Sequence, residues 1–368
     1  MKKLLPEVCT IQYGFPFDSA KFSDSNGMPL IRIRDVVRGY SETYTTEEYK
    51  SEYIVHENDL LIGMDGEFNI AKWGKTPALL NQRVCRLAPN DSIDKDYLFY
   101  FMPIALKRIE EKTPFVTVKH LSAKELNKIE IPILPLEEQR KIAETLSKVD
   151  ELIAFRDRQL AKLDELVKAR FVEMFGNPIE NTMNWPKKLL RDITTKIGSG
   201  ATPKGGRESY PNAGVSLIRS MNVYDGQFLY KDLAHLTDEQ ATQLNGVTVE
   251  AEDVLVNITG ASVARSCVVP KDVLPARVNQ HVAIVRCNRE LLNPIFTNKM
   301  FINNEFKKAL LSIGESGGAT RQAITKKQLE ELSVVVPPLS IQNEFFTFSE
   351  CVDQQKQTVQ QSLEKLEL

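Results

Sequence analysis

The chain contains two divergent copies of one module, and this internal repeat constrains its fold more than any other feature. Four short motifs recur in the same order at offsets of 187, 194, 198 and 203 residues. The first copies are Leu30-Ile31-Arg32, Asp59-Leu60-Leu61-Ile62, Asn81-Gln82-x-Val84 and Pro135-Leu136-x-x-Gln139, and the second copies are Leu217-Ile218-Arg219, Asp253-Val254-Leu255-Val256, Asn279-Gln280-x-Val282 and Pro338-Leu339-x-x-Gln342. Chance matches would scatter, whereas ordered matches with steadily rising offsets indicate a duplication with loop insertions in the second copy.

Each copy has the residue pattern of an α+β domain. Short apolar runs bounded by Gly, Asn, Asp and Pro predict strands. These runs are Leu30 to Val37, Asp59 to Met64 and Arg83 to Leu87 in the first copy, and Val215 to Ser220, Asp253 to Ile258 and His281 to Arg286 in the second. A helical pattern follows over 96–111 and 293–312. We therefore expect two α+β domains over 1–135 and 185–338.

A long helix is predicted after each domain, over 136–176 and, in a shorter form, over 339–368. Counting alternately by three and four residues from Gln139 gives ten positions, of which seven are apolar. A 3.5-residue period of this kind is typical of a coiled-coil seam. The apolar seam positions are Ile142, Leu146, Val149, Ile153, Leu160, Leu163 and Val167, and then Phe345, Val352, Val359, Leu363 and Leu366. The two helices either pair with each other, which we favour, or pack separately on their own domains.

Composition sets the broad class of the protein. A hydrophobic content of 42% and a charged content of 26% are those of a soluble globular chain. We expect a cytoplasmic protein, because no apolar run is long enough for a signal peptide or a membrane span. Five dispersed cysteines and four isolated histidines argue against a disulfide framework and against a metal site. The net charge of −2 gives no indication of nucleic acid, so a DNA-binding face would need its basic residues on one side.

Several segments resemble the specificity subunits of type I restriction–modification systems. The residues from Ile131 to Leu146 (IPILPLEEQRKIAETL), followed by Val149-Asp150-Glu151-Leu152-Ile153, are similar to the signature helical region of that family. The segment Ala169 to Gly176 (ARFVEMFG) is similar to that family as well, and so is Asn184-Trp185-Pro186, which opens the second module. Gly198 to Lys204 (GSGATPK) resembles the opening of a target-recognition domain. The order of domain, helix, domain and helix extends the resemblance over essentially the whole chain.

The resemblance implies an architecture and a function. Two target-recognition domains would be separated by two long helices that pair as an antiparallel coiled coil, giving a pseudo-twofold molecule. Each domain would read one half of a bipartite, asymmetric site in double-stranded DNA. Two modification subunits would supply S-adenosylmethionine and methylate adenine, and restriction subunits would use ATP and cleave, so this chain would bind no cofactor. A helix of ~40 residues is roughly 60 Å long and could hold two domains about one DNA turn apart.

The second module offers a glycine-rich loop as a candidate DNA contact. The segment 198–207 combines flexible backbone with the cations Lys204 and Arg207 and the hydroxyl of Thr202. It lacks the spacing of a phosphate-binding P-loop, so the alternative is an ordinary solvated loop. Arg32 and Arg219 occupy equivalent repeat positions and could contact phosphate or guanine. A structural ion pair shared by both modules is the alternative that we favour slightly for them.

A further matched pair of segments lies before the long helices. In the register that aligns the two prolines, Lys119 and His120 fall opposite Gln322 and Ala323, and Arg321 falls opposite Val118. Polar residues that differ within a shared frame are expected at specificity-determining positions, although drifting surface turns would look the same. Lys72 and Lys75 flank Trp73, which we expect in the core. The repeated Asn-Gln pairs favour turn or strand-edge hydrogen bonding over adenine recognition.

The sequence carries no motif of a catalytic centre. It lacks an N-P-P-Y-type tetrapeptide, a G-x-G-x-x-G loop, an H-E-x-x-H zinc motif and a nucleophile elbow. We therefore expect a non-enzymatic subunit with no catalytic residue and no bound metal. Two alternatives stay open, namely a coiled-coil scaffold that binds only proteins and a detached targeting half of a fused methyltransferase–nuclease.

Overall fold

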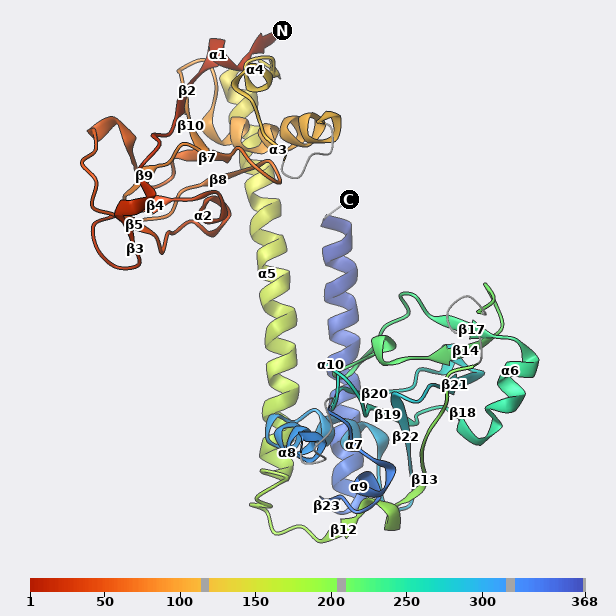
Figure 1. The fold of residues 1–368 in the computed structure, drawn as a ribbon. Helices are drawn as coiled ribbons and strands as arrows, with labels where there is room; N and C mark the ends of the chain where they lie inside the picture. Colours follow the sequence, from red (N-terminus) through yellow and green to blue (C-terminus); the bar gives the residue numbers. More distant parts are fainter. Residues whose placement is uncertain (114–118, 204–209, 316–321, 367–368) are drawn as a thin grey trace. The chain divides into compact units, whose positions relative to one another are not determined.

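The computed structural model describes residues 1–113, 119–203, 210–315 and 322–366 (Figure 1). The chain divides into two compact units, Met1–Ala154 and Phe155–Leu368. Both units combine sheets with helices, which confirms the α+β class. The boundary between the units lies within the long helix α5 (Leu136–Phe175), which contributes residues to each.

The described residues of the first unit form three sheets. Its strands are β1 (Lys2–Leu4), β2 (Cys9–Tyr13), β3 (Phe22–Ser23), β4 (Met28–Ile31), β5 (Tyr44–Thr45), β6 (Ile54–Val55), β7 (Leu60–Gly63), β8 (Asn69–Lys72), β9 (Ala78–Leu80), β10 (Val84–Pro89) and β11 (Glu130–Pro132). They form sheets in the orders β1-β11, β2-β10-β7-β8 and β3-β5-β4-β9-β6. Its shorter helices are α1 (Leu5–Val8), α2 (Ile33–Arg38), α3 (Lys95–Lys112) and α4 (Ala123–Leu126).

The second unit repeats this plan. Its strands are β12 (Lys187–Leu189), β13 (Thr194–Ser199), β14 (Val215–Ile218), β15 (Val223–Tyr224), β16 (Gln227–Phe228), β17 (Ala234–Leu236), β18 (Thr248–Val249), β19 (Val254–Asn257), β20 (Ser266–Val268), β21 (Ala276–Val278), β22 (Val282–Cys287) and β23 (Ser333–Val335). The sheets follow the orders β12-β23, β13-β22-β19-β20 and β17-β14-β21-β18, with the hairpin β15-β16 in addition. The helices are α6 (Asp238–Gln243), α7 (Pro294–Phe301), α8 (Asn304–Glu315), α9 (Lys326–Glu330) and α10 (Leu339–Leu366).

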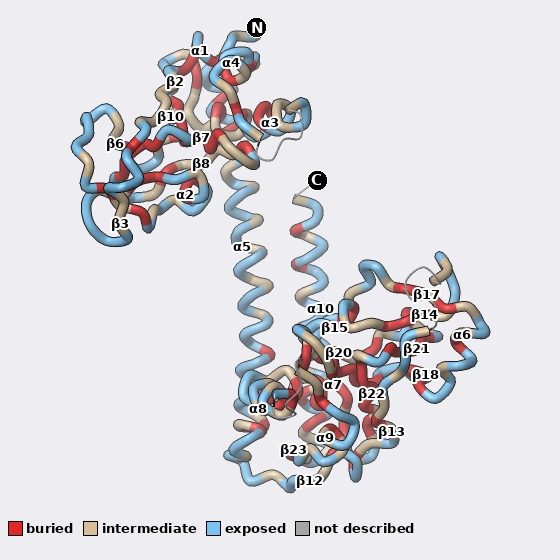
Figure 2. The backbone as a smooth tube through the Cα atoms, in the orientation of Figure 1, coloured by how far each residue is buried: buried red, intermediate tan, exposed pale blue. Residues whose placement is uncertain are grey.

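The topology shows that the sequence repeat is a structural repeat. In each unit, one strand pair is parallel and the equivalent pairs are β4 with β9 and β14 with β21. Strands β7 and β19 are buried along their whole length, and their successive side chains enter two different hydrophobic clusters. In Figure 2 the buried residues concentrate in these sheets and in the helices that cover them. The central strand of each unit is therefore covered on both faces, as its unbroken apolar run requires.

The sequence-based interpretation was wrong for two local segments. The run from Leu30 to Val37 is a short strand followed by helix α2, because the Asp35 carboxylate accepts a hydrogen bond from the Arg32 N–H at 2.9 Å. The expected helix over 293–312 is two helices, α7 and α8. The Asn303 side chain accepts a hydrogen bond from the Glu305 N–H at 3.1 Å and starts the second of them. In both places a short polar side chain bonds the backbone locally and sets a helix start.

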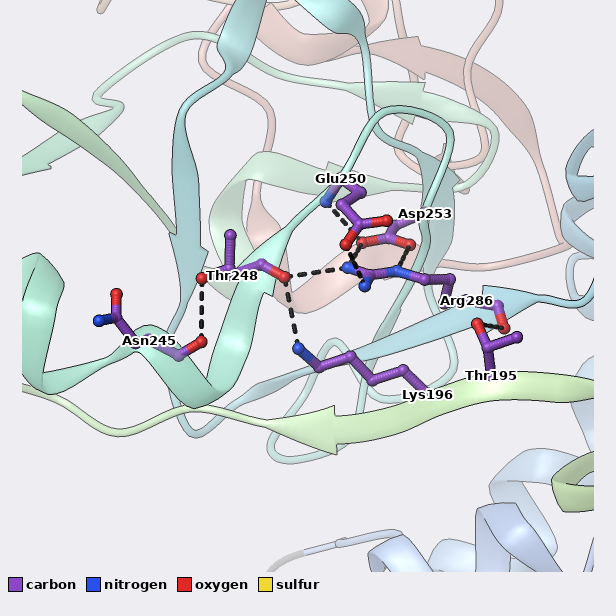
Figure 3. A network of polar contacts seen from close by, with 7 residues as sticks. All are labelled: Thr195, Lys196, Asn245, Thr248, Glu250, Asp253 and Arg286. Carbon is purple, nitrogen blue, oxygen red and sulfur yellow. Dashed lines mark hydrogen bonds and ion pairs between the residues drawn. The ribbon is translucent and has the colours of Figure 1, made fainter.

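Each unit contains a partly buried arginine–aspartate ion pair with the same role. Arg86 bonds Asp59 at 3.0 Å and the Ile54 carbonyl at 2.8 Å. Arg286 bonds Asp253 at 2.8 Å and the Thr248 carbonyl at 3.0 Å, and Lys196 reaches the same carbonyl (Figure 3). The bonds to Asp253 raise the pKa of Arg286. We call the sheets β2-β10-β7-β8 and β13-β22-β19-β20 the main sheets of the two units. Each arginine joins its main sheet to the strand that precedes β7 or β19.

A fully buried glutamine begins each long helix. The Gln139 amide accepts a hydrogen bond from the Asp94 N–H at 2.8 Å and donates to the Leu134 and Ser92 carbonyls at 2.8 and 3.3 Å. Gln342 repeats all three bonds with the Asn293 N–H and the Pro337 and Leu291 carbonyls, at 2.9, 2.8 and 3.0 Å. Each glutamine fastens its long helix to the start of α3 or α7, which explains the repeated Pro-Leu-x-x-Gln motif.

In the second unit the end of α5 and helix α10 run antiparallel. Arg170 bonds Glu344 at 3.1 Å, and Asp164 bonds Lys356 at 2.6 Å. Aromatic rings fill the space between these helices and α7. The ring centroids of Phe171 and Phe345 are 5.5 Å apart, those of Phe175 and Phe345 5.4 Å, and those of Phe175 and Phe296 4.7 Å.

The predicted seam residues differ in their surroundings. Val167, Phe345 and Val352 lie in the main hydrophobic cluster of the second unit, with Leu163 packed against it, and Val359 and Leu363 are also buried. Leu160 and Leu366 are half-buried, as are Val149 and Ile153 in the first unit. Ile142 and Leu146 are exposed. In this first part of α5 the buried residues are Gln139 and Ala143, which contact the first unit. The buried face of the helix therefore differs from the predicted seam.

We expect Gln342→Ala to lower the free energy of unfolding by about 2–3 kcal/mol, because buried backbone groups lose their partners. The matched control is Gln361→Ala on the same helix, where the side chain is exposed and the change should stay within about 0.5 kcal/mol. Guanidinium denaturation followed by circular dichroism measures both values. Equal effects for the two variants would show that Gln342 does not anchor the helix.

The cysteines provide an independent check of burial. Burial raises the pKa of the Cys9, Cys85 and Cys267 thiols to about 12 and that of Cys287 to about 11, whereas Cys351 is exposed on α10. Only a thiolate attacks a disulfide reagent. At pH 8 we expect one thiol per native chain to react quickly with a coloured disulfide reagent, and all five after denaturation. Rapid reaction of two or more thiols in the native chain would contradict this fold.

Candidate DNA interface

In each unit three segments that are distant in sequence meet at one end of the main sheet. They are the loop after β7 or β19, the segment before α4 or α9, and the segment after β2 or β13. In the first unit, the Gly66 N–H donates to the Lys119 carbonyl at 2.9 Å, and the Leu121 N–H to the Met64 carbonyl at 2.7 Å. In the second, the Gly260 N–H donates to the Gln322 carbonyl at 3.1 Å, and the Ile324 N–H to the Ile258 carbonyl at 2.8 Å. The segments before α4 and α9 therefore lie beside the loops that follow β7 and β19. We call this end of each sheet the variable edge.

In each unit a glycine allows the segment that follows β2 or β13 to reach the variable edge. A Cβ on Gly14 would lie 2.0 Å from the Asn81 carbonyl oxygen, and one on Gly200 would lie 1.7 Å from the Val278 carbonyl oxygen. The chain can therefore pass this point only without a side chain. Gly200 therefore serves close packing of the protein's own backbone.

The variable edge of the first unit is basic. An open pocket there is lined by Phe17, Ser19, Phe22, Arg32, Ile33, Arg34, Asn81, Gln82 and Arg83. Arg83 lies 3.5 Å from Asp65, whose other carboxylate oxygen lies 2.5 Å from His120 Nδ1. Arg32, Arg83 and His120 thus belong to one continuous exposed surface. Guanidinium groups at such a surface can bind phosphate or the O6 and N7 edge of guanine.

The variable edge of the second unit has amide and hydroxyl groups instead. Thr202 Oγ1 donates to Gln280 Oε1, and Gln280 Nε2 lies 3.2 Å from His281 Nε2. His281 Nδ1 is hydrogen-bonded to Thr259 Oγ1. Gln322 Nε2 donates to Glu315 at 2.8 Å near the same edge. In the second unit, Thr259 occupies the position of Asp65, His281 that of Arg83, and Ala323 that of His120.

The structure separates the predicted cations into different surroundings. Arg32 and Arg219 occupy the same local position, and the Arg219 N–H donates to Asn222 at 3.1 Å as that of Arg32 does to Asp35. The Arg219 side chain bonds the Asp232 carbonyl, whereas that of Arg32 lines the basic pocket. Lys204, Arg207 and Arg321 lie outside the described residues.

Three lysines singled out from the sequence contribute less to this edge. Lys72 pairs with Asp96 at 2.9 Å, 5.0 Å from the centre of the Phe99 ring, at the opposite end of β8 from the variable edge. Lys75 is exposed in the loop after β8. The Lys119 ammonium group donates to the Glu110 carbonyl at 2.9 Å, so its charge is used within the protein. At the variable edge, Lys119 takes part through its backbone carbonyl. Trp73 is buried, as expected.

Sequence reasoning did not single out Arg83 and Asp65, which the structure places at the variable edge. Asn81 and Asn279 are buried and accept local backbone hydrogen bonds, as expected for turn residues. Gln82 and Gln280 are exposed at the variable edge. The available signal was the repeat register at offset 198, which places Arg83 opposite His281. A position that differs directly after a shared motif was a candidate by the same argument that selected His120.

Two features are absent from the described ranges of the chain. Within them no group of three or more His, Cys, Asp and Glu side chains is arranged to hold a metal ion. None of the described helices combines the length and the apolar character needed to cross a membrane.

Comparison with known proteins identifies the family. The family model described as type I restriction modification DNA specificity domain matches residues 1–165 and 183–368. The chain is 29% identical over 391 residues to the type I restriction enzyme EcoBI specificity subunit of Escherichia coli, covering 95% of this chain and 80% of that one. It is 24% identical over 359 residues to the putative type I restriction enzyme MjaX specificity subunit of Methanocaldococcus jannaschii, covering 87% and 79%.

Solved structures show the same fold. The S subunit of a type I restriction–modification system from M. genitalium aligns with a TM-score of 0.59 at 14% identity, covering 100% of this chain and 92% of that chain. A chain from a structural study of complex assembly and conformational transition in the type I restriction–modification system aligns with a TM-score of 0.60 at 17% identity, covering 100% and 94%. With the family model matching both halves of the repeat, this chain belongs to the type I restriction–modification DNA specificity family.

Proposed function

We propose that this chain is the specificity subunit of a type I restriction–modification complex and that each unit reads one half of a bipartite, asymmetric site in double-stranded DNA. The observation that carries the proposal is the variable edge. One backbone frame occurs twice, and it presents Asp65, Arg83 and His120 in one unit but Thr259, His281 and Ala323 in the other. A shared scaffold positions each domain on the duplex, and different polar side chains on it specify different bases.

The chain contributes specificity, and its partners contribute the chemistry. Two modification subunits bind S-adenosylmethionine and methylate adenine, and restriction subunits use ATP and cleave. No catalytic group and no cofactor site is assigned to this chain, which works in the cytoplasm with the rest of the complex. Support comes from the family description and from the curated relatives, which are named specificity subunits.

The long helix has a length suited to setting the gap between the half-sites. Helix α5 has 40 residues, which corresponds to roughly 60 Å. Adding or removing helical turns would alter the gap while leaving both half-sites unchanged.

The experiment that tests the proposed function is single-molecule methylome sequencing of a host with and without this gene. Loss of one bipartite adenine-methylated motif on deletion is the expected result. If no motif disappears and the assembled complex protects no particular DNA sequence, the protein is instead a scaffold that binds only proteins. If a motif disappears but its two halves do not depend on the two units separately, the two-reader model is wrong.

The basic pocket of the first unit gives a prediction for DNA affinity. Replacing Arg32 and Arg83 by glutamine removes two cations from the variable edge, and each lost phosphate contact should lower the log–log salt slope of binding by about 0.9. Binding of the assembled complex to its site, measured by fluorescence anisotropy across a salt series, reports the slope. The matched control is Arg108→Gln, an exposed arginine on α3. The same slope for the double variant and the control would remove the pocket from the interface.

A further inference from the structure

Gln280 is exposed, yet its side-chain amide is held at both ends. Thr202, from the segment after β13, donates to Gln280 Oε1. His281 lies 3.2 Å from Gln280 Nε2 and is itself hydrogen-bonded to Thr259, from the loop after β19. Three segments that are distant in sequence therefore fix one exposed amide. Exposed glutamines ordinarily sample many rotamers, so this arrangement requires an explanation.

The chemistry of these groups fixes the direction of each hydrogen bond. An amide nitrogen only donates, so a neutral His281 accepts at Nε2 and carries its proton on Nδ1. The Nδ1–H then donates to Thr259 Oγ1. With Thr202 donating to Oε1, the Gln280 amide retains one N–H and one oxygen lone pair. One free donor and one free acceptor on a fixed planar group match the N7 acceptor and the N6 donor that adenine presents in the major groove.

We propose that Gln280 reads an adenine in the half-site bound by the second unit, with Thr202 and His281 as positioning residues. The assignment rests on the proposed function. The amide is already oriented in the free protein, so binding DNA does not have to immobilise its side chain. The free energy of its hydrogen bonds is then available to discriminate between bases.

The first unit lacks every partner that fixes this amide. Gln82 is the equivalent glutamine, and in the strand register Pro16 replaces Thr202, Arg83 replaces His281 and Asp65 replaces Thr259. Proline has no hydroxyl, and Arg83 is drawn toward Asp65 at 3.5 Å. Over the described residues, no hydrogen bond joins the Gln82 side chain to another group. The side chain of this glutamine is therefore held in place in the second unit only. In the first unit, Gln82 lies next to the arginine Arg83 instead.

The test compares variants of the full chain in the assembled complex, with methylome sequencing and methylation rates on DNA carrying each base at every position of the site. Gln280→Ala should lower the preference for adenine at one position of one half-site by about 5- to 150-fold. Gln280→Glu, which accepts but cannot donate, should lose adenine and favour cytosine at that position. Thr202→Val should give a smaller change at the same position. The control Gln361→Ala should change nothing, and Gln82→Ala should affect only the other half-site.

The outcomes separate the two levels of the account. If the unaltered complex directs no bipartite methylation, the proposed function fails and the assignment fails with it. If the unaltered complex has a bipartite motif and both Gln280 variants keep that motif unchanged, the assignment alone is wrong. A uniform loss of rate on all sequences with unchanged base preference would make Gln280 a structural residue and would likewise overturn the assignment. A relaxed or switched base at one position supports it.

Discussion

Two buried glutamines connect the long helices to the domains that precede them. Gln139 and Gln342 each satisfy one backbone N–H and two carbonyls that would otherwise be unpaired in the interior. Since an unpaired buried polar group is costly, each long helix has one preferred direction and one preferred register on its domain. The antiparallel packing of α10 against the end of α5 in the second unit, with the Phe171 and Phe345 rings between them, depends on this fixed starting point.

The same division between a fixed interior and a variable edge occurs in the sheets. Arg86 with Asp59 and Arg286 with Asp253 hold the two main sheets in the same way, and the parallel strand pairs are in equivalent places. At one end of each sheet, however, the side chains change from charged groups to amides and hydroxyls. A protein that must read two different half-sites with one scaffold needs this combination, because the backbone frame sets the docking geometry and the edge sets the sequence.

The sequence predicted the elements that depend on local or repeated patterns. The 3.5-residue period predicted a long helix over 136–176, which the structure has as Leu136–Phe175, and the repeat register anticipated the equivalence of the two main sheets. It failed where one polar side chain redirects the backbone, as Asp35 and Asn303 do. The contact of Asp65 with His120 joins residues 55 positions apart, and no spacing rule could have placed them together. Of the predicted cations, Arg32 lies at the variable edge, whereas Lys72 is paired elsewhere.

The central claim is that the two units are separate readers built on one frame, and a chimaeric chain tests it most directly. Residues 1–135 would be replaced by a second copy of residues 185–338, so that both long helices keep their Pro-Leu-x-x-Gln starts. The methylome of cells that express the chimaera with its partner subunits is then sequenced. The account predicts a bipartite motif in which both halves are the half-site of the second unit. A motif that still contains two different half-sites would contradict it.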